Sequence, residues 1–289
     1  MATINTNMAA NVASNAMTRN ERSMGATMER LSTGLRINSA KDDAAGLAIT
    51  SKMTSQINGL NQAVRNANDA ISMIQVAEGA LKGMTDMLQR MRELAVQSIS
   101  DSNTSADRTA LNNEFTQLRS QIEDIADDTQ WNGVSFLSTG TDMTFQVGAN
   151  AGQTITVALD DFNQAVTSGP LGNVDTDGGT TNALLSSLDI LTAAKAAKAL
   201  YGTAEAITNI DSARANLGAS MSRLEYAADN LTNVAQNSSA ARSRVLDADY
   251  AAETTELART QIIQQAATAM LAQANQSQQQ VLALLTSAA

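Results

Sequence analysis

Apolar residues recur at alternating three- and four-residue steps through long stretches of both halves of this chain. The series lie within residues 24–35, 57–95, 111–125, 217–235 and 263–284. Because an α-helix has about 3.6 residues per turn, this spacing places the apolar side chains on one face of each segment. We therefore predict a mainly α fold, in which long helices from the two ends of the chain pack as antiparallel partners in a coiled-coil-like bundle.

The middle of the chain follows a different pattern. Apolar and polar side chains alternate within residues 143–147 and again within 155–159, and glycines lie between the two runs. This period of two predicts a small β-hairpin near 140–162. Residues 166–200 contain many Gly, Thr, Ser, Asn and Asp residues in their first half, so we expect a surface loop and a short helix there.

Composition excludes several classes of function. The 289 residues include no cysteine and no histidine, which removes disulfides, the usual zinc sites and His-dependent nucleophilic catalysis. We expect no enzyme activity and no cofactor. The net charge of −10 argues against a nucleic-acid partner. No apolar run approaches the ~20 residues that span a bilayer, and the first residues lack the features of a cleaved signal peptide, so we expect no membrane partner.

The distribution of charge indicates where the chain is buried. Residues 1–18 and 260–289 contain no charged side chain, and every Lys, Arg, Asp and Glu lies between them. Disordered tails are usually charged or rich in proline, so uncharged ends rich in Ala, Met, Leu and amides suggest burial. Two narrow helices cannot bury all of the apolar surface within 262–271 and 281–285, and the remainder needs a partner. The pattern alone fits a polymer or an isolated helical bundle.

Two clusters of acidic residues could be considered as sites. Lys41, Asp42, Asp43 and Gly46 suggest a carboxylate pair, but Ser39 and Asp42 also fit a capping box at a helix start, which we favour.

The second cluster lies in the predicted loop. Asn173, Asp175, Asp177 and Gly178 occupy positions 1, 3, 5 and 6 of a calcium loop, yet Leu184 stands where a Glu ligand is needed. Asp and Gly are ordinary loop residues, so we favour a plain loop.

Several blocks resemble the bacterial flagellins. Residues 30–49 read RLSTGLRINSAKDDAAGLAI, which is similar to the N-terminal signature of that family. Further matching blocks are LQRMRELAVQS at 88–98, WNG at 131–133, AQANQ at 272–276 and VLALL at 281–285. The blocks occur in the family's order, which makes the resemblance far more specific than one short motif.

The resemblance implies a filament subunit that polymerises for swimming. It implies an inner core domain from residues 1–44 and 246–289, and an outer tube domain from 45–245. In that family the terminal segments order on assembly, and the chain is secreted by a type III export apparatus with its chaperone. Implied partners are other copies of the chain, the filament cap, the hook–filament junction proteins and the vertebrate Toll-like receptor for flagellin. The alternatives are a hook–filament junction protein and a monomeric helical adhesin or receptor ligand.

The resemblance also assigns roles to particular residues. Lys41, Asp42, Asp43 and Gly46 would form the junction of the two domains. The expected polymerisation residues are Met8, Val12, Ile263, Met270, Val281, Leu284 and Leu285. The expected receptor contacts are Gln89, Arg90, Leu94 and Glu114, of which Arg90 and Leu94 could instead contact neighbouring subunits.

Overall fold

The chain folds into two compact units. In the computed structural model the terminal unit contains residues 1–56 and 236–289, and the central unit contains 57–235. The description covers residues 6–163, 169–171, 174–176 and 182–287; the side chains of 175, 182, 183, 278 and 281–287 lie outside it. The units divide within two long helices, whereas the sequence suggested domain boundaries at the helix ends near 44 and 246.

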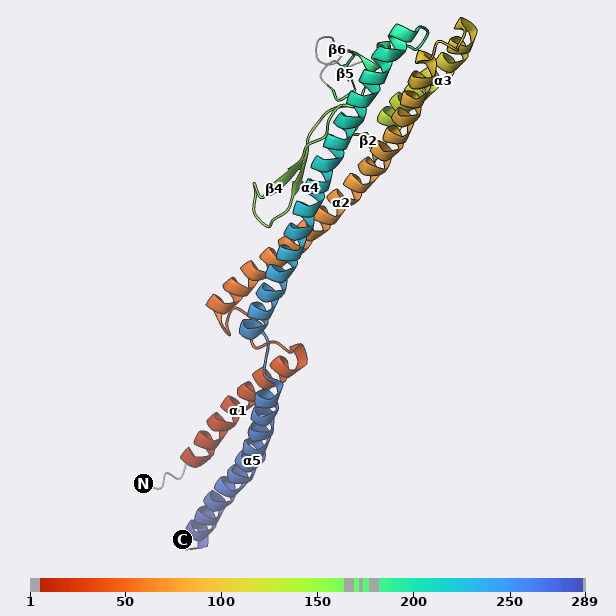
Figure 1. Ribbon diagram of the computed structural model, residues 1–289. Helices are drawn as coiled ribbons and strands as arrows, with labels where there is room; N and C mark the ends of the chain where they lie inside the picture. The colour runs from red at the N-terminus through yellow and green to blue at the C-terminus, as the bar shows by residue number, and fades with distance from the viewer. Residues whose placement is uncertain (1–5, 164–168, 172–173, 177–181, 288–289) are drawn as a thin grey trace. The chain divides into compact units, whose positions relative to one another are not determined.

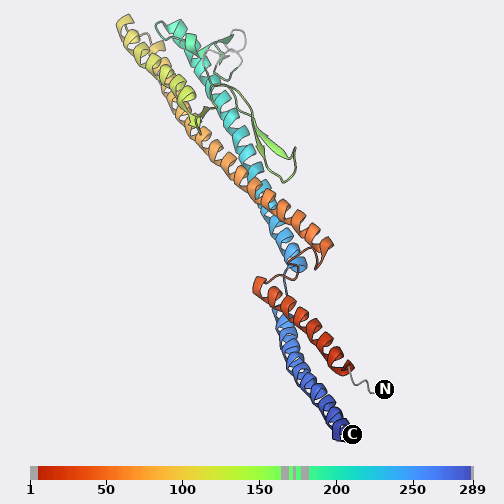
Figure 2. The ribbon, with the colours of Figure 1, turned by 180° about the vertical axis from the view of Figure 1, so that it is seen from behind.

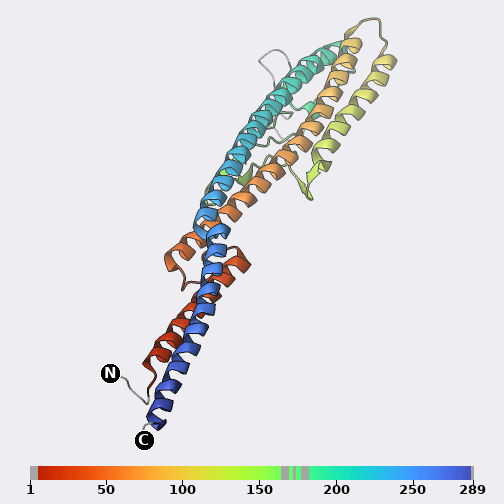
Figure 3. The same ribbon diagram turned by 90° about the horizontal axis from the view of Figure 1, so that it is seen from below.

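The terminal unit is built on two antiparallel helices. Helix α1 (Met8–Thr33) and helix α5 (Tyr250–Ser287) lie side by side in every view (Figures 1, 2 and 3). Asn7 contacts Ala274, while Arg30 contacts Glu253, so the two helices run in opposite directions. The predicted pairing of the two ends of the chain is confirmed.

The central unit contains helical segments, a β-hairpin and short strand pairs. Helix α2 (Ala44–Ile99) and helix α4 (Ala193–Leu246) supply its long segments, and helix α3 (Ser105–Asp128) lies beside α2 (Figure 3). Strand β3 (Met143–Gln146) pairs antiparallel with β4 (Thr154–Val157), which confirms the predicted hairpin. This hairpin lies along α4 (Figure 2).

Shorter elements complete the central unit. Strands β1 (Gln130–Trp131) and β2 (Val134–Ser135) pair antiparallel. So do strands β5 (Val174–Asp175) and β6 (Asn182–Ala183). A 3-10 turn, η1 (Leu185–Ser187), precedes α4.

The start of α4 corrects the expectation for residues 166–200. Residues 193–200 are not a short separate helix but the first turns of α4, which is 54 residues long. Small residues continue its buried face towards the N-terminus at three- and four-residue steps, and a count of large apolar residues therefore misses them. The small residues are Ala196, Ala199, Thr203, Ala206 and Ala213, and Ile210 lies on the same buried face.

The buried face of α2 differs from the predicted one in one stretch. In the sequence, the apolar residues Ile71, Ile74 and Ala77 are separated by two consecutive three-residue steps, which predicts a change of phase. In the structure Ala70 is buried and Ile71 only partly so, and the steps Ala67, Ala70, Ile74 alternate regularly. Position on the helix decides burial here, and alanine fills the interface where a larger neighbour lies at its edge.

Three of the four phenylalanines lie in the core of the central unit. Phe115, Phe136 and Phe162 are fully buried, together with Leu, Met and Ala side chains of α2 and α4. The spacing of Thr104 and Asp107 in the sequence predicts a capping box. Helix α3, which carries Phe115, begins with this box, in which Thr104 and Asp107 bond each other's backbone N–H groups. The cap is therefore confirmed.

The turn between β1 and β2 was not recognised in the sequence. Asn132 and Gly133 both have positive φ angles, of 51° and 78°. An Asn-Gly pair is the preferred two-residue hairpin turn because both residues tolerate this conformation. The Asn-Gly dipeptide was the signal that could have predicted these strands.

Two glycine substitutions should have opposite effects on stability. Gly133→Ala is expected to lower the free energy of unfolding of the central unit by about 1–2 kcal/mol, because a side chain disfavours positive φ. Gly79→Ala should raise it by about 0.5–1 kcal/mol, since Gly79 lies within helix α2 and an added Cβ meets nothing within 4 Å. Urea unfolding followed by circular dichroism measures both. If both substitutions changed the free energy of unfolding in the same direction, the assignment of the turn would be contradicted.

Candidate functional site

The interface between α1 and α5 contains mostly small and polar residues. Its inward positions follow three- and four-residue steps on both helices, as in a coiled coil. On α1 they are Ala10, Ala13, Met17, Asn20, Met24, Thr27 and Leu31. On α5 they are Glu253, Leu257, Thr260, Gln264, Ala267, Leu271 and Ala274. The large apolar members, Met17, Met24, Leu31, Leu257 and Leu271, are only partly buried, whereas the buried members, Asn20, Thr27 and Thr260, are polar.

Polar contacts determine how these helices align. The buried Asn20 side chain donates a hydrogen bond from Nδ2 to the carbonyl of Thr260 at 2.7 Å. Arg30 and Glu253 form an ion pair at 3.2 Å, and the Tyr250 hydroxyl donates to the carbonyl of Leu31 at 2.6 Å. The buried Asn20 favours one register, because a shifted alignment would leave its side chain unpaired.

An apolar groove runs along one flank of the α1–α5 pair. Figure 1 shows the two helices that form it. The groove encloses about 660 Å³. We call it the assembly groove; it is lined by Met8, Ala9, Val12, Ala13, Ala16, Ile263, Ala266, Ala267 and Met270. None of these residues can ionise, so the groove offers apolar surface and no acid–base chemistry.

The large side chains of the assembly groove are exposed. Met8 is 61% exposed, Val12 and Met270 are each 65% exposed, and Ile263 is 39% exposed. These four are predicted polymerisation residues, and the structure brings them together from two ends of the sequence. The other three, Val281, Leu284 and Leu285, have side chains outside the described part of the chain.

The loop between α1 and α2 contains the predicted junction residues. Helix α1 ends at Gly34, whose φ of 72° is left-handed, and the Arg36 N–H then donates to the carbonyl of Leu246 at 2.7 Å. Asp43 bonds the backbone N–H of Gly46 at 2.8 Å and so caps α2. A side chain at Gly46 would meet the side chains of Asp43 and Ile37, so a substitution there would have to displace the capping carboxylate or Ile37.

The expected capping box at Ser39 and Asp42 needs correction. Asp42 accepts hydrogen bonds from the backbone N–H and hydroxyl of Ser39, at 2.9 and 3.0 Å, and closes a turn that precedes α2. The hydrogen bond from the Ser39 side chain is the main cause that lowers the pKa of Asp42 from its ordinary value. Asp43, one residue later, caps the helix. Lys41 is exposed. The acidic pair thus has structural partners.

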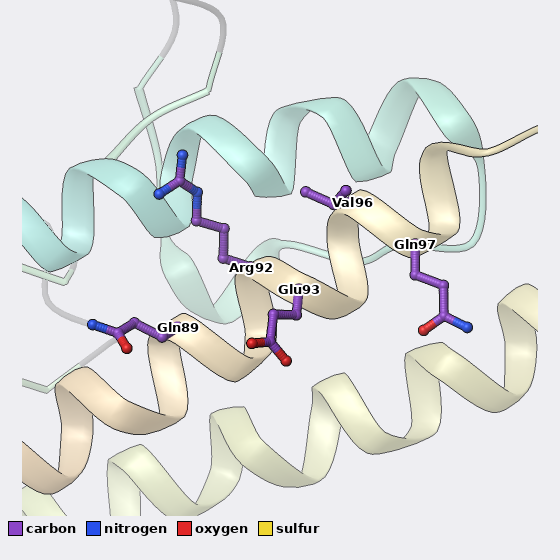
Figure 4. Close-up of a pocket in the computed structure, with 5 residues that line it drawn as sticks. All are labelled: Gln89, Arg92, Glu93, Val96 and Gln97. Atoms are coloured by element: carbon purple, nitrogen blue, oxygen red, sulfur yellow. The ribbon is translucent and has the colours of Figure 1, made fainter.

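A second groove lies on α2 in the central unit, and of the predicted receptor contacts its lining includes Gln89. It is lined by Gln89, Arg92, Glu93, Val96 and Gln97. Figure 4 shows Arg92 and Val96 pointing towards α4, and Glu93 and Gln97 on the side of α3. Its lining is mixed, with charged and amide groups beside one exposed valine.

The four predicted receptor contacts do not share one surface. Arg90 is exposed and pairs with Glu114 on α3 and Glu93 on α2, both at 2.9 Å. Gln89 is also exposed, whereas Leu94 is only 1% exposed and belongs to the core. The expectation that Leu94 is a helix-surface contact is therefore corrected: its position on α2 faces inward.

The calcium-loop candidate cannot be placed. Asn173, Asp177 and Gly178 lie outside the described residues, as does the side chain of Asp175. In the part of the chain that the structure describes, no group of three or more acidic residues could hold a metal ion. No described helix is long and apolar enough to cross a membrane.

Comparisons with known proteins match nearly the whole chain. Residues 4–141 match the bacterial flagellin N-terminal helical region, and residues 200–285 match the C-terminal helical region. A flagellin of Halalkalibacterium halodurans is 46% identical over 259 residues, covering 89% of this chain and 90% of that protein. The flagellar filament 33 kDa core protein of Treponema phagedenis is 42% identical over 293 residues, covering 98% of this chain and 99% of that protein.

A solved structure resembles the fold. The putative flagellar hook-associated protein from Vibrio parahaemolyticus has a TM-score of 0.58 and covers 71% of this chain and 100% of its own. Its sequence identity is 14%, so this likeness concerns the fold alone.

Proposed function

We propose that this chain, which belongs to the bacterial flagellin family, polymerises through the assembly groove of its α1–α5 pair. As a flagellin it is a structural subunit of the flagellar filament, which assembles from copies of the chain, and it is not an enzyme. The proposal concerns which surface drives that assembly.

The observation that carries the proposal is which side chains are buried and which are exposed in the terminal unit. The buried side chains between α1 and α5 are the polar Asn20, Thr27 and Thr260, while the large apolar Met8, Val12, Ile263 and Met270 are exposed beside them. Burying one such side chain contributes about 1.5–3 kcal/mol, and the uncharged ends add no cost of burying ions. The terminal unit is therefore suited to association with further copies.

The geometry of the groove favours an open polymer. A groove on one flank of the helix pair needs a different, complementary surface on the next copy. Contacts between unlike patches need not close into a ring and then generate a helical filament. We accordingly assign residues 1–44 and 246–289 to an inner core, and 45–245 to an outer tube, of the filament.

Family membership supports further proposals about the export of the chain and its neighbours in the filament. We propose secretion to the outside of the cell through the flagellar export apparatus, with an export chaperone beforehand and cap and hook–filament junction proteins as neighbours afterwards. The absence of cysteine suits such a route, since no thiol can be oxidised during passage.

Receptor recognition is proposed for α2 and α3 in a modified form. Gln89, Arg90 and Glu114 are exposed and could contact the vertebrate Toll-like receptor for flagellin. Leu94 is buried and would act by keeping α2 in place rather than by contact. The two alternative functions, a junction protein and a monomeric adhesin, have less support, because the likeness to a hook-associated protein is one of fold at low identity.

A charge placed in the assembly groove tests the proposed surface. Val12→Glu is expected to raise the critical concentration for seeded polymerisation at least about tenfold, because association would bury a carboxylate. Val12 is exposed in the single chain, so the substitution should leave its fold intact. Sedimentation of filaments grown on short seeds measures the critical concentration.

The matched control is the neighbouring residue. Asn11 is exposed on the same helix but does not line the groove, so Asn11→Glu adds an identical charge outside it. If both variants assemble as the parent chain does, or if both fail equally, the groove is not the surface that drives assembly.

A further inference from the structure

The assembly groove holds two exposed thioethers at its walls. Met8 comes from α1 and Met270 from α5, and they are 61% and 65% exposed. They are the sulfur-bearing residues among those that line the groove. Because the chain has no cysteine, no thiol of its own competes with them for an oxidant.

We propose that Met8 and Met270 are sites of oxidation by peroxides, and that their oxidation blocks assembly of the chain. The inference rests on the proposed role of the assembly groove. Oxidation would regulate that surface, because the side chains that drive association are the ones that an oxidant outside the cell would modify.

The reaction balances without any further reagent. The thioether sulfur attacks one oxygen of hydrogen peroxide, the O–O bond breaks, and an S–O bond forms. The sulfur loses two electrons and becomes a sulfoxide, while the second peroxide oxygen leaves as water after proton transfer. The product keeps the length of the side chain but is polar.

Polarity is the change that matters in this groove. The lining contains only aliphatic and thioether side chains, so a sulfoxide oxygen buried against it has no side-chain donor in the groove. A buried polar group without a hydrogen bond is unfavourable, and association should therefore weaken when either methionine is oxidised.

The remaining methionines provide internal references. Met73, Met84 and Met91 are 0% exposed in the core of the central unit and should react slowly. Met28 is 55% exposed on α1 but does not line the groove. It should therefore be oxidised as readily as Met8 without the same effect on assembly.

The first test needs no mutation. Full-length monomer is partly oxidised with hydrogen peroxide, polymerised on seeds and sedimented, and peptides from pellet and supernatant are compared by mass spectrometry. Sulfoxide at Met8 and Met270 is expected to be enriched at least about fivefold in the supernatant, while sulfoxide at Met28 divides evenly. An even division at Met8 and Met270 would overturn the proposal.

Variants then test whether oxidation of these two methionines causes the loss of assembly. Leucine has nearly the volume of methionine and no sulfur, so the double variant Met8→Leu, Met270→Leu is compared with itself, and peroxide should leave its extent of assembly unchanged. Met28→Leu should stay as sensitive as the parent chain. The proposal is wrong if the double variant assembles but loses assembly on oxidation just as the parent does.

The two proposals fail in different ways. If untreated parent chain assembles, Val12→Glu does not, and oxidised chain assembles normally, the groove drives assembly but the inference about oxidation is wrong. If Val12→Glu assembles as well as the parent chain, the groove is not the assembly surface, and an inhibition by peroxide would then have another origin.

Discussion

A chain that lacks residues 260–289 is expected to remain monomeric where the full chain forms filaments. The deletion removes Ile263, Ala266, Ala267 and Met270, which form one wall of the assembly groove. It also removes the carbonyl of Thr260, to which the buried Asn20 donates. Both the groove and the contacts that align α1 with α5 are lost, so seeded polymerisation followed by sedimentation should show no pelleted protein.

The control is the stability of the central unit. Residues 57–235 form a compact unit that includes none of the deleted residues, so its urea or thermal transition should be unchanged. A truncated chain that still forms filaments would show that the C-terminal wall of the groove is dispensable. A truncated chain with a weakened central unit would instead indicate general misfolding.

The second large effect is expected at Leu94, in the central unit. Leu94→Ala should lower the free energy of unfolding by about 2–5 kcal/mol, because it removes a fully buried side chain and leaves a cavity. Urea unfolding followed by circular dichroism measures this change. The matched control is Val96→Ala on the same helix, which is 55% exposed and should change stability by less than about 0.5 kcal/mol.

This comparison separates two roles for Leu94. If Leu94 were a surface contact for a receptor or a neighbouring subunit, both alanine variants would have similar and small effects on stability. A large effect at Leu94 alone would mean that any loss of receptor binding in that variant follows from disturbance of α2. Arg90→Ala, at an exposed ion pair, then becomes the better probe of direct contact.

The elements with strong periodicity could be predicted from the sequence. The helices at the two ends, the hairpin of β3 and β4, and the cap at Thr104 follow from local patterns that need no knowledge of the rest of the chain. The start of α4 and the buried face of α2 were harder to predict from the sequence. Both depend on alanine and threonine, whose burial is decided by the partner helix rather than by their own hydrophobicity.

The candidate site was predictable in part. The uncharged ends of the sequence suggested that Met8, Val12, Ile263 and Met270 need a partner. Only the packing of α1 against α5 shows that these side chains come together in one groove rather than between the helices. The same holds for Leu94, since a motif match cannot state which face of α2 turns inward.

The sequence by itself determined the family, the helical class and the uncharged ends of this flagellin, because these depend on residue identity and spacing along the chain. The tertiary structure alone decided which side of each helix is covered. Asn20 pairs with Thr260 and thereby aligns two segments that are 240 residues apart. That alignment leaves Met8, Val12, Ile263 and Met270 exposed, because helical periodicity places only one stripe of each helix against its partner.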